Sequence, residues 1–190
     1  KLLLLNEKRK LIENQIYEEA LIQAEEQKNS NFILVYGSNW HNGVIGIIAS
    51  KLVSKFNKPS IVISFGNSYG TGSARSIQSI DLSKIILLAK DKNILVNGGG
   101  HKMAAGIKIK KDSLNTFKSF LDDYFKDYSN NLFIKINKYD SLLSVDKINS
   151  DLIEEILKLE PFGAGNNEPQ FIIKDIKIQK TQIIKDKHIL

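Results

Sequence analysis

Three short stretches of this chain combine glycines with side chains that bind anions. The first, G-G-G-H-K-M-A-A-G at residues 98–106, begins with Gly98, Gly99, Gly100, His101 and Lys102. Consecutive glycines cost backbone entropy, which a fold accepts where side chains would obstruct something. Main-chain N–H groups of such a loop, together with the start of a following helical turn, can converge on an anion. The stretch predicts a phosphate site in which His101 donates a hydrogen bond and Lys102 adds charge; alone, it also fits a tight turn.

The second stretch, G-T-G-S-A-R-S at residues 70–76, holds Arg75, one of two arginines in the chain. Because lysine supplies almost all of the 27 basic residues, an arginine here indicates a need for a planar, forked cation that can grip a phosphate. Ser73 and Ser76 add hydroxyl groups, and the small residues let main chain approach a ligand. The alternative is a glycine turn leading into a strand with a solvated arginine.

The third stretch, W-H-N-G-V-I-G at residues 40–46, follows an expected strand and opens an expected helix. This is the usual ligand position in an open α/β sheet. Trp40 can stack on a base, and His41 can contact a phosphate or orient a neighbour. A core aromatic under the loop is an equally good interpretation of Trp40.

These stretches are positioned by a predicted strand–helix–strand unit. Residues 32–36 and 60–65 have the apolar composition of buried strands, and residues 44–56 carry an apolar stripe with helical spacing. Such a unit implies parallel pairing through a right-handed crossover. The remaining expected elements of this α/β domain are strands at 73–76 and 107–109, helices at 81–90 and from residue 112 or 113, and a loop at 98–100.

The chain divides by composition into three segments. Residues 1–30 form a charged connecting helix, which starts without a cap or an initiating Met and so suggests a piece of a longer protein. Residues 31–129 form the α/β domain, which ends at a polar hinge, residues 129–131. Residues 132–190 form part of a small β domain with an open strand edge. Its expected elements are a strand at 133–136, a helix capped by Ser150, and two paired strands at 171–178 and 181–190.

Composition excludes several functional classes. The 190 residues include no cysteine, which excludes disulfides, zinc–thiolate sites and thiol catalysis. No apolar run approaches the roughly 20 residues that span a bilayer and no signal peptide is visible, so we expect no membrane association and a cytoplasmic location. The histidines and carboxylates show no metal-ligand spacing, so no metal site is predicted within the chain. The net charge of +6 only weakly supports a polyanionic partner, because lysine is abundant throughout.

In chain order, these motifs resemble those of the RecJ family of bacterial single-strand-specific DNA exonucleases. The three stretches, the third extended as W-H-N-G-V-I-G-I-I-A-S-K-L, are similar to its DHHA1 domain. Residues 159–171, L-E-P-F-G-A-G-N-N-E-P-Q-F, resemble its OB-type domain, with Asn167 in place of the family's proline. The resemblance implies a DHHA1-type mixed α/β sheet flanked by helices, preceded by the connecting helix and followed by a partial OB-type domain.

The resemblance also implies 5′→3′ degradation of single-stranded DNA with Mn²⁺ or Mg²⁺, bound by a DHH domain that we expect to be missing here. This chain alone should then bind DNA without cutting it. Arg75 and His101 would hold phosphates near the scissile bond as catalytic residues. The implied substrate-binding residues are Trp40, His41, Ser73, Ser76, Gly98, Gly99, Gly100 and Lys102. Implied partners are single-stranded DNA and the DHH domain, with a single-strand-binding protein and a helicase as further candidates.

Two other functions fit the same motifs. The glycine–histidine stretch occurs across DHH-type phosphoesterases, so one alternative is a hydrolase of short oligonucleotides or nucleotides. Residues 159–171 argue against it, because they resemble RecJ in particular. The other alternative is a non-catalytic module that binds single-stranded nucleic acid. Substrate length separates the two enzymes, and a metal-binding half encoded upstream would argue against the module.

Overall fold

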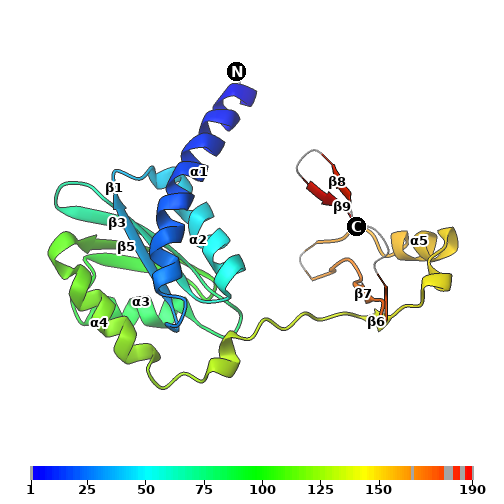
Figure 1. The fold of residues 1–190 in the computed structure, drawn as a ribbon. Helices are drawn as coiled ribbons and strands as arrows, with labels where there is room; N and C mark the ends of the chain where they lie inside the picture. The colour runs from blue at the N-terminus through cyan, green and yellow to red at the C-terminus, as the bar shows by residue number, and fades with distance from the viewer. Residues whose placement is uncertain (1, 164, 178–181, 185–186, 190) are drawn as a thin grey trace. The chain divides into compact units, whose positions relative to one another are not determined.

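A computed structural model describes residues 2–163, 165–177, 182–184 and 187–189. The chain separates into two compact units, residues 1–135 and 136–190. In the first unit, helices cover a five-stranded mixed sheet with the strand order β1-β2-β3-β5-β4 (Figure 1). Across the described part of the chain, no helix is long and apolar enough to cross a membrane.

The elements of the first unit alternate between helix and strand in its first half. In order they are α1 (Leu2–Glu26), β1 (Ile33–Ser38), α2 (Asn42–Phe56), β2 (Ser60–Phe65), β3 (Tyr69–Arg75), α3 (Leu82–Asp91), β4 (Asn97–His101), β5 (Ala104–Lys110) and α4 (Leu114–Phe125). β1 and β2, which α2 connects in the chain, pair directly with each other in parallel, and this confirms the predicted strand–helix–strand unit. All other pairs in this sheet are antiparallel.

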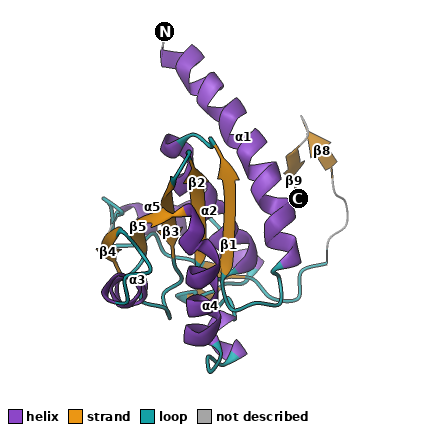
Figure 2. Ribbon diagram, turned by 90° about the vertical axis from the view of Figure 1, so that its left-hand side faces the viewer, coloured by secondary structure: helices purple, strands orange, loops and turns teal. Residues whose placement is uncertain are grey.

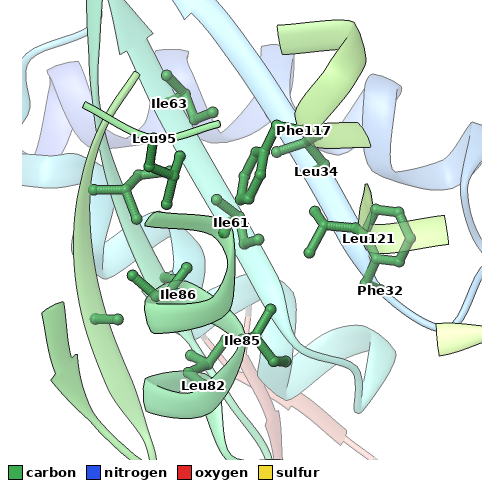
Figure 3. Close-up of a cluster of buried hydrophobic side chains, with 14 of the residues drawn as sticks. Phe32, Leu34, Ile61, Ile63, Leu82, Ile85, Ile86, Leu95, Phe117 and Leu121 are labelled. Atoms are coloured by element: carbon green, nitrogen blue, oxygen red, sulfur yellow. The ribbon is translucent and has the colours of Figure 1, made fainter. Parts of the chain in front are cut away.

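One face of the sheet is closed by α3 and α4. Isoleucines of β2 and β5 contribute to this core, as do Ile85 and Ile86 of α3 and Phe117 and Leu121 of α4. Figure 3 shows the two helices contributing side chains to the cluster around Ile61 and Ile63. Since each of these side chains is removed from water, the cluster fixes the strands as a rigid layer.

The opposite face is covered only in part, by α1 and α2. Their core includes Ile33 and Val35 of β1, Val62 of β2 and Ile48 of α2, but no residue of β3, β4 or β5. α1 lies beside β1 at the edge of the sheet (Figure 2), and α2 packs on β2 and β3. The part of this face formed by β3, β5 and β4 is called the open sheet face below.

Three features of the β3–β5 region differ from the sequence-based expectation. The expected loop at residues 98–100 is wrong, because these glycines lie within β4 and pair with β5. The helical turn expected after them is also absent from this described segment: Lys102 and Met103 form a two-residue turn between the strands. β3 begins at Tyr69 rather than at residue 73, because its glycines pair with β2 and β5.

The second unit contains short elements. β6 (Ser141–Leu142) pairs in parallel with β7 (Phe171–Ile172), and β8 (Gln182–Ile184) pairs with β9 (Lys187–Ile189). The expected pairing of one long strand at 171–178 with another at 181–190 is therefore wrong, although 178–181, 185–186 and 190 lie outside the described residues.

Two further expectations, one within this unit and one just before it, are also corrected. α5 (Ser150–Leu157) is capped by Asn149, whose Oδ1 accepts from Leu152 N at 2.9 Å, and not by Ser150. The expected strand at 133–136 is wrong. The chain instead forms a 3-10 helix (Asn130–Phe133), tied to the first unit by Ser79 Oγ, which donates to the Leu132 carbonyl at 2.9 Å.

Candidate nucleic-acid interface

Arg75 and His101 lie in one cross-strand row on the open sheet face. Arg75 of β3 and His101 of β4 both pair with Ala104 of β5, which lies between them. Residues paired across a sheet direct their side chains to the same face, and two strand spacings separate the outer pair by about 10 Å. The structure thus brings these two site candidates to one surface.

The Arg75 guanidinium is held against α2 without an acidic partner. Its Nη1 donates to Ser73 Oγ at 3.1 Å and to the Ala74 carbonyl at 2.9 Å. A Cβ added at Gly46 of α2 would lie 3.2 Å from Nη2, so the glycine makes room for this group. No carboxylate among the described residues lies within 4.0 Å of it. A half-buried guanidinium with free N–H groups and no counter-ion is suited to bind an anion in a bidentate way.

A hollow of about 500 Å³ opens beside this guanidinium. Its lining includes Asn42 and Gly43 from the first turn of α2, and Thr71 and Ser73 from β3. The first turn of a helix presents unpaired main-chain N–H groups and a positive dipole end, which favour an anion.

His41 forms the cap of this helix. Its Nδ1 accepts from Gly43 N at 3.0 Å, so the neutral ring carries its proton on Nε2. The side chain is exposed, which leaves that N–H available to a ligand.

A strip of bare main chain runs across the sheet next to the Arg75 row. Gly106 pairs with Ser73 on one side and with Gly99 on the other. A Cβ added at Gly99 or Gly106 would meet nothing within 4 Å. These two glycines therefore leave space on the open side rather than relieve crowding. A phosphodiester strand can approach the main chain here more closely than at any side-chain-bearing row.

The other two glycines of the triplet serve the fold. A Cβ at Gly98 would meet Ile86 Cγ2 at 2.6 Å, on the closed side of the sheet. Gly100 has φ +157° and a Cβ there would meet the Ala104 carbonyl oxygen at 2.3 Å, so the hairpin requires glycine. Within the triplet, Gly99 alone is positioned to contact a ligand through an open face.

Two residues expected at the site lie in the interior instead. Trp40 is 6% exposed, its ring packs where a Gly37 side chain would be, and its Nε1 donates to Glu19 Oε2 at 2.8 Å. Ser76 is 4% exposed, and its hydroxyl donates to the Ile80 carbonyl at 2.9 Å. Because the polar groups of both are already bonded inside the protein, neither is retained as a ligand contact.

Lys102 lies at the tip of the β4–β5 hairpin. Its carbonyl accepts from Leu82 N, and the neighbouring Met103 carbonyl accepts from Ser76 N, both at 3.0 Å. These bonds fix the tip against α3 and the end of β3, while the Lys102 side chain is exposed. The lysine is therefore close in sequence and space to His101 and adds positive charge to that end of the face.

The sequence reasoning also missed exposed side chains of this face. Tyr69 and Thr71 alternate with core-facing glycines on β3, and Lys108 and Lys110 of β5 pair with Thr71 and Tyr69. All four are exposed. For the lysines, the sequence signal was the alternation in A-G-I-K-I-K at residues 105–110, which directs the isoleucines to one face of a strand and the lysines to the other. Interpreting 107–109 as simply apolar overlooked this alternation.

The open sheet face carries positive charge alone. β3, β4 and β5 contain no aspartate or glutamate, while their basic residues are Arg75, Lys108 and Lys110. Across the described residues no three histidine, aspartate or glutamate side chains gather in a way that could hold a metal ion. The face is therefore suited to hold a polyanion, and these residues do not fit a divalent metal site.

Comparison with known proteins gives two family matches. The family model of the DHHA1 domain matches residues 29–127, and that of the RecJ OB domain matches residues 139–190. The single-stranded-DNA-specific exonuclease RecJ of Bacillus subtilis is 32% identical over 184 residues, which cover 95% of this chain and 23% of the relative. RecJ of Thermus thermophilus is 26% identical over 188 residues, which cover 97% of this chain and 26% of the relative.

Solved structures agree with these matches. The crystal structure of Thermus thermophilus RecJ with Mg²⁺ aligns with a TM-score of 0.77 and 28% identity, covering 88% of this chain and 26% of that chain. The structure of the same protein with Mn²⁺ aligns with a TM-score of 0.77 and 27% identity, covering 89% of this chain and 24% of that chain. This chain therefore corresponds to about a quarter of the length of these relatives.

Proposed function

This chain belongs to the DHHA1 domain family and carries a RecJ OB domain, and from this membership we propose that it is the substrate-holding, C-terminal portion of a RecJ-type 5′→3′ single-stranded-DNA exonuclease. Its part in the reaction is to hold DNA phosphates against a metal-binding DHH domain encoded outside these residues. The observation that carries the proposal is the acid-free row of Arg75, Ala104 and His101 beside a strip of bare main chain.

The residues of the open sheet face divide the binding between them. The free edge of the Arg75 guanidinium donates two parallel hydrogen bonds to one phosphate, and Ser73 holds the guanidinium in place. His101 donates to a phosphate on the far side of Ala104. Gly99 and Gly106 let the strand lie on the main chain between them. Charge that develops on a phosphate held in this way would be stabilised by groups already in position.

The metal belongs to another part of the proposed enzyme. RecJ relatives have been solved with Mg²⁺ and with Mn²⁺, and the described residues of this chain do not fit either ion. We therefore assign the ion to the DHH domain. A single-strand-binding protein and a helicase are the protein partners that fit this role in DNA repair and recombination.

Binding and cleavage by the chain alone test the proposal. We expect it to bind a 5′-phosphorylated, fluorescently labelled dT12 with an affinity that falls steeply with salt, and to bind a blunt duplex of the same length more weakly. With added Mn²⁺, the dT12 should remain intact on a denaturing gel. Equal binding of duplex and single strand would argue against the single-strand assignment. Robust cleavage would mean that this chain holds a metal site of its own.

A further inference from the structure

We propose that Tyr69 and Lys108 form a second contact site for the same DNA strand, at the end of the open sheet face opposite Arg75. This inference rests on the proposed function and adds a requirement for strand length. Tyr69, Thr71, Ser73 and Arg75 alternate along β3 and so share one face, and Lys108 is added to that face by its pairing with Thr71. The site is thus continuous with the Arg75 row, along the direction of β3.

The chemistry of this pair suits a nucleotide. Lys108 Nζ lies 5.3 Å from the centroid of the Tyr69 ring, and Tyr69 is still 46% exposed. Neither side chain has a carboxylate partner among the described residues, and Lys110, opposite Tyr69, is exposed as well. An exposed aromatic ring provides a platform for a base, and an adjacent ammonium can bind the phosphate next to that base.

The distance between the two sites determines how long a DNA strand must be to contact both. Four residues along β3 separate Arg75 from the row of Thr71 and Lys108, which is about 13 Å, and Tyr69 lies about 20 Å away. At about 3.4 Å per stacked nucleotide, these distances are about four and six steps, so a stacked strand of roughly five to seven nucleotides reaches both sites. A dinucleotide can occupy the Arg75 row only. The second contact would therefore favour long single strands over short oligonucleotides.

Chain-length dependence of binding tests this inference directly. Fluorescence anisotropy with the full chain would compare 5′-phosphorylated dT2 and dT12. Tyr69→Leu should lower the affinity for dT12 about tenfold, equivalent to 1.4 kcal/mol, because stacking is lost, and should leave dT2 unchanged. Tyr69→Phe keeps the ring and should retain wild-type affinity for both.

Lys108→Met gives a second readout. The slope of the logarithm of the dT12 binding constant against the logarithm of the salt concentration should fall in magnitude by about 0.7. This is the change expected when one phosphate contact on a single strand is lost. The matched control is Lys55→Met: Lys55 is also exposed, but its Nζ lies 2.8 Å from Glu25 Oε1, so its removal should change dT12 affinity less than twofold. Circular dichroism would verify that each variant is folded.

The outcomes separate this inference from the proposed function. If Tyr69→Leu and Lys108→Met alter dT2 and dT12 equally, or alter neither, the second contact site is overturned. Arg75→Ala should weaken binding of both lengths. If Arg75→Ala has no effect on either length, the proposed function itself fails; if Arg75→Ala acts but the Tyr69 and Lys108 variants do not, only the second contact is lost.

Discussion

The seam between α1 and α2 and the open sheet face use basic residues in opposite ways. In the seam, Glu13 bonds both Arg9 and Lys51, the latter at 2.7 Å, and Lys55 is paired with Glu25. On the open sheet face, Arg75 and Lys108 have no acidic partner in the described structure. The net charge of +6 does not distinguish these two regions. What distinguishes them is whether a carboxylate lies within reach, because only an unbalanced cation is free to bind phosphate.

Glycines differ between the two regions in the same way. Gly37, beside the seam, is needed because the Trp40 ring occupies the position of a Cβ, at 2.1 Å. Gly99 and Gly106, on the open sheet face, have nothing within 4 Å of that position. A side chain is excluded at the first by the protein's own packing, whereas at the other two the space is open. Substitutions should therefore damage folding in one region and binding in the other.

The largest effect is expected from Gly106→Val. The added methyl groups would stand on the bare strip and hold a phosphate away from the neighbouring Arg75 and His101, lowering dT12 affinity about a hundredfold, which is the loss of roughly two charge-assisted hydrogen bonds from those side chains. The free energy of unfolding should not fall, because valine has a higher strand propensity than glycine. Anisotropy and urea unfolding measure the two quantities.

A graded control sharpens this result. Gly106→Ala should give an intermediate loss, and Thr116→Val, an exposed position on α4, should leave binding unchanged. If Gly106→Val binds dT12 as tightly as the wild type, the bare strip is not part of the interface.

A smaller effect, on stability, is expected from Glu13→Gln in the seam. The hydrogen bond from Lys51 is the main cause that holds the pKa of Glu13 below its ordinary value of 4.5, with Arg9 adding to it. A carboxyl with a lowered pKa stabilises the folded state above its unfolded pKa, and this contribution is lost as the pH falls through the folded value. The variant should lose about 1 kcal/mol at pH 7, and the difference from wild type should shrink on acidification, as the pH falls through the lowered pKa of the folded state.

Urea unfolding at pH 7 and at acidic pH measures this difference in stability, with Glu18→Gln, at an exposed position on the same helix, as the control. Binding of dT12 at pH 7 should be unchanged in both variants. A pH-independent destabilisation by Glu13→Gln would show that lost packing, and not the ion pairs, is responsible.

The sequence predicts best what local pattern determines. β1, α2 and β2 are contiguous in the chain, so their apolar spacing was enough to predict the parallel unit. Arg75 was found because arginine is rare in this chain. The family resemblance supplied the DHHA1 and OB assignments, which the family models match.

Long-range contacts explain what the sequence could not provide. Gly99 has no side chain to signal a strand, and its pairing with Gly106 decides its structure. Trp40 fitted a base-stacking or a core role equally well until Glu19, 21 residues earlier, was found to bond its indole N–H. Lys108 became a site residue only once β5 was placed beside β3.

Arg75 offers the most direct test of the central claim that its guanidinium grips a DNA phosphate. The measurement is the affinity of Arg75→Ala, Arg75→Lys and the wild type for 5′-phosphorylated dT12, at matched salt. We predict that Arg75→Ala binds at least about tenfold more weakly, in line with the loss of a hydrogen bond to a charged group. The affinity of Arg75→Lys should lie between those of Arg75→Ala and the wild type, because lysine keeps the positive charge but cannot donate two parallel hydrogen bonds to one phosphate. Affinity of Arg75→Ala within twofold of the wild type would contradict the claim.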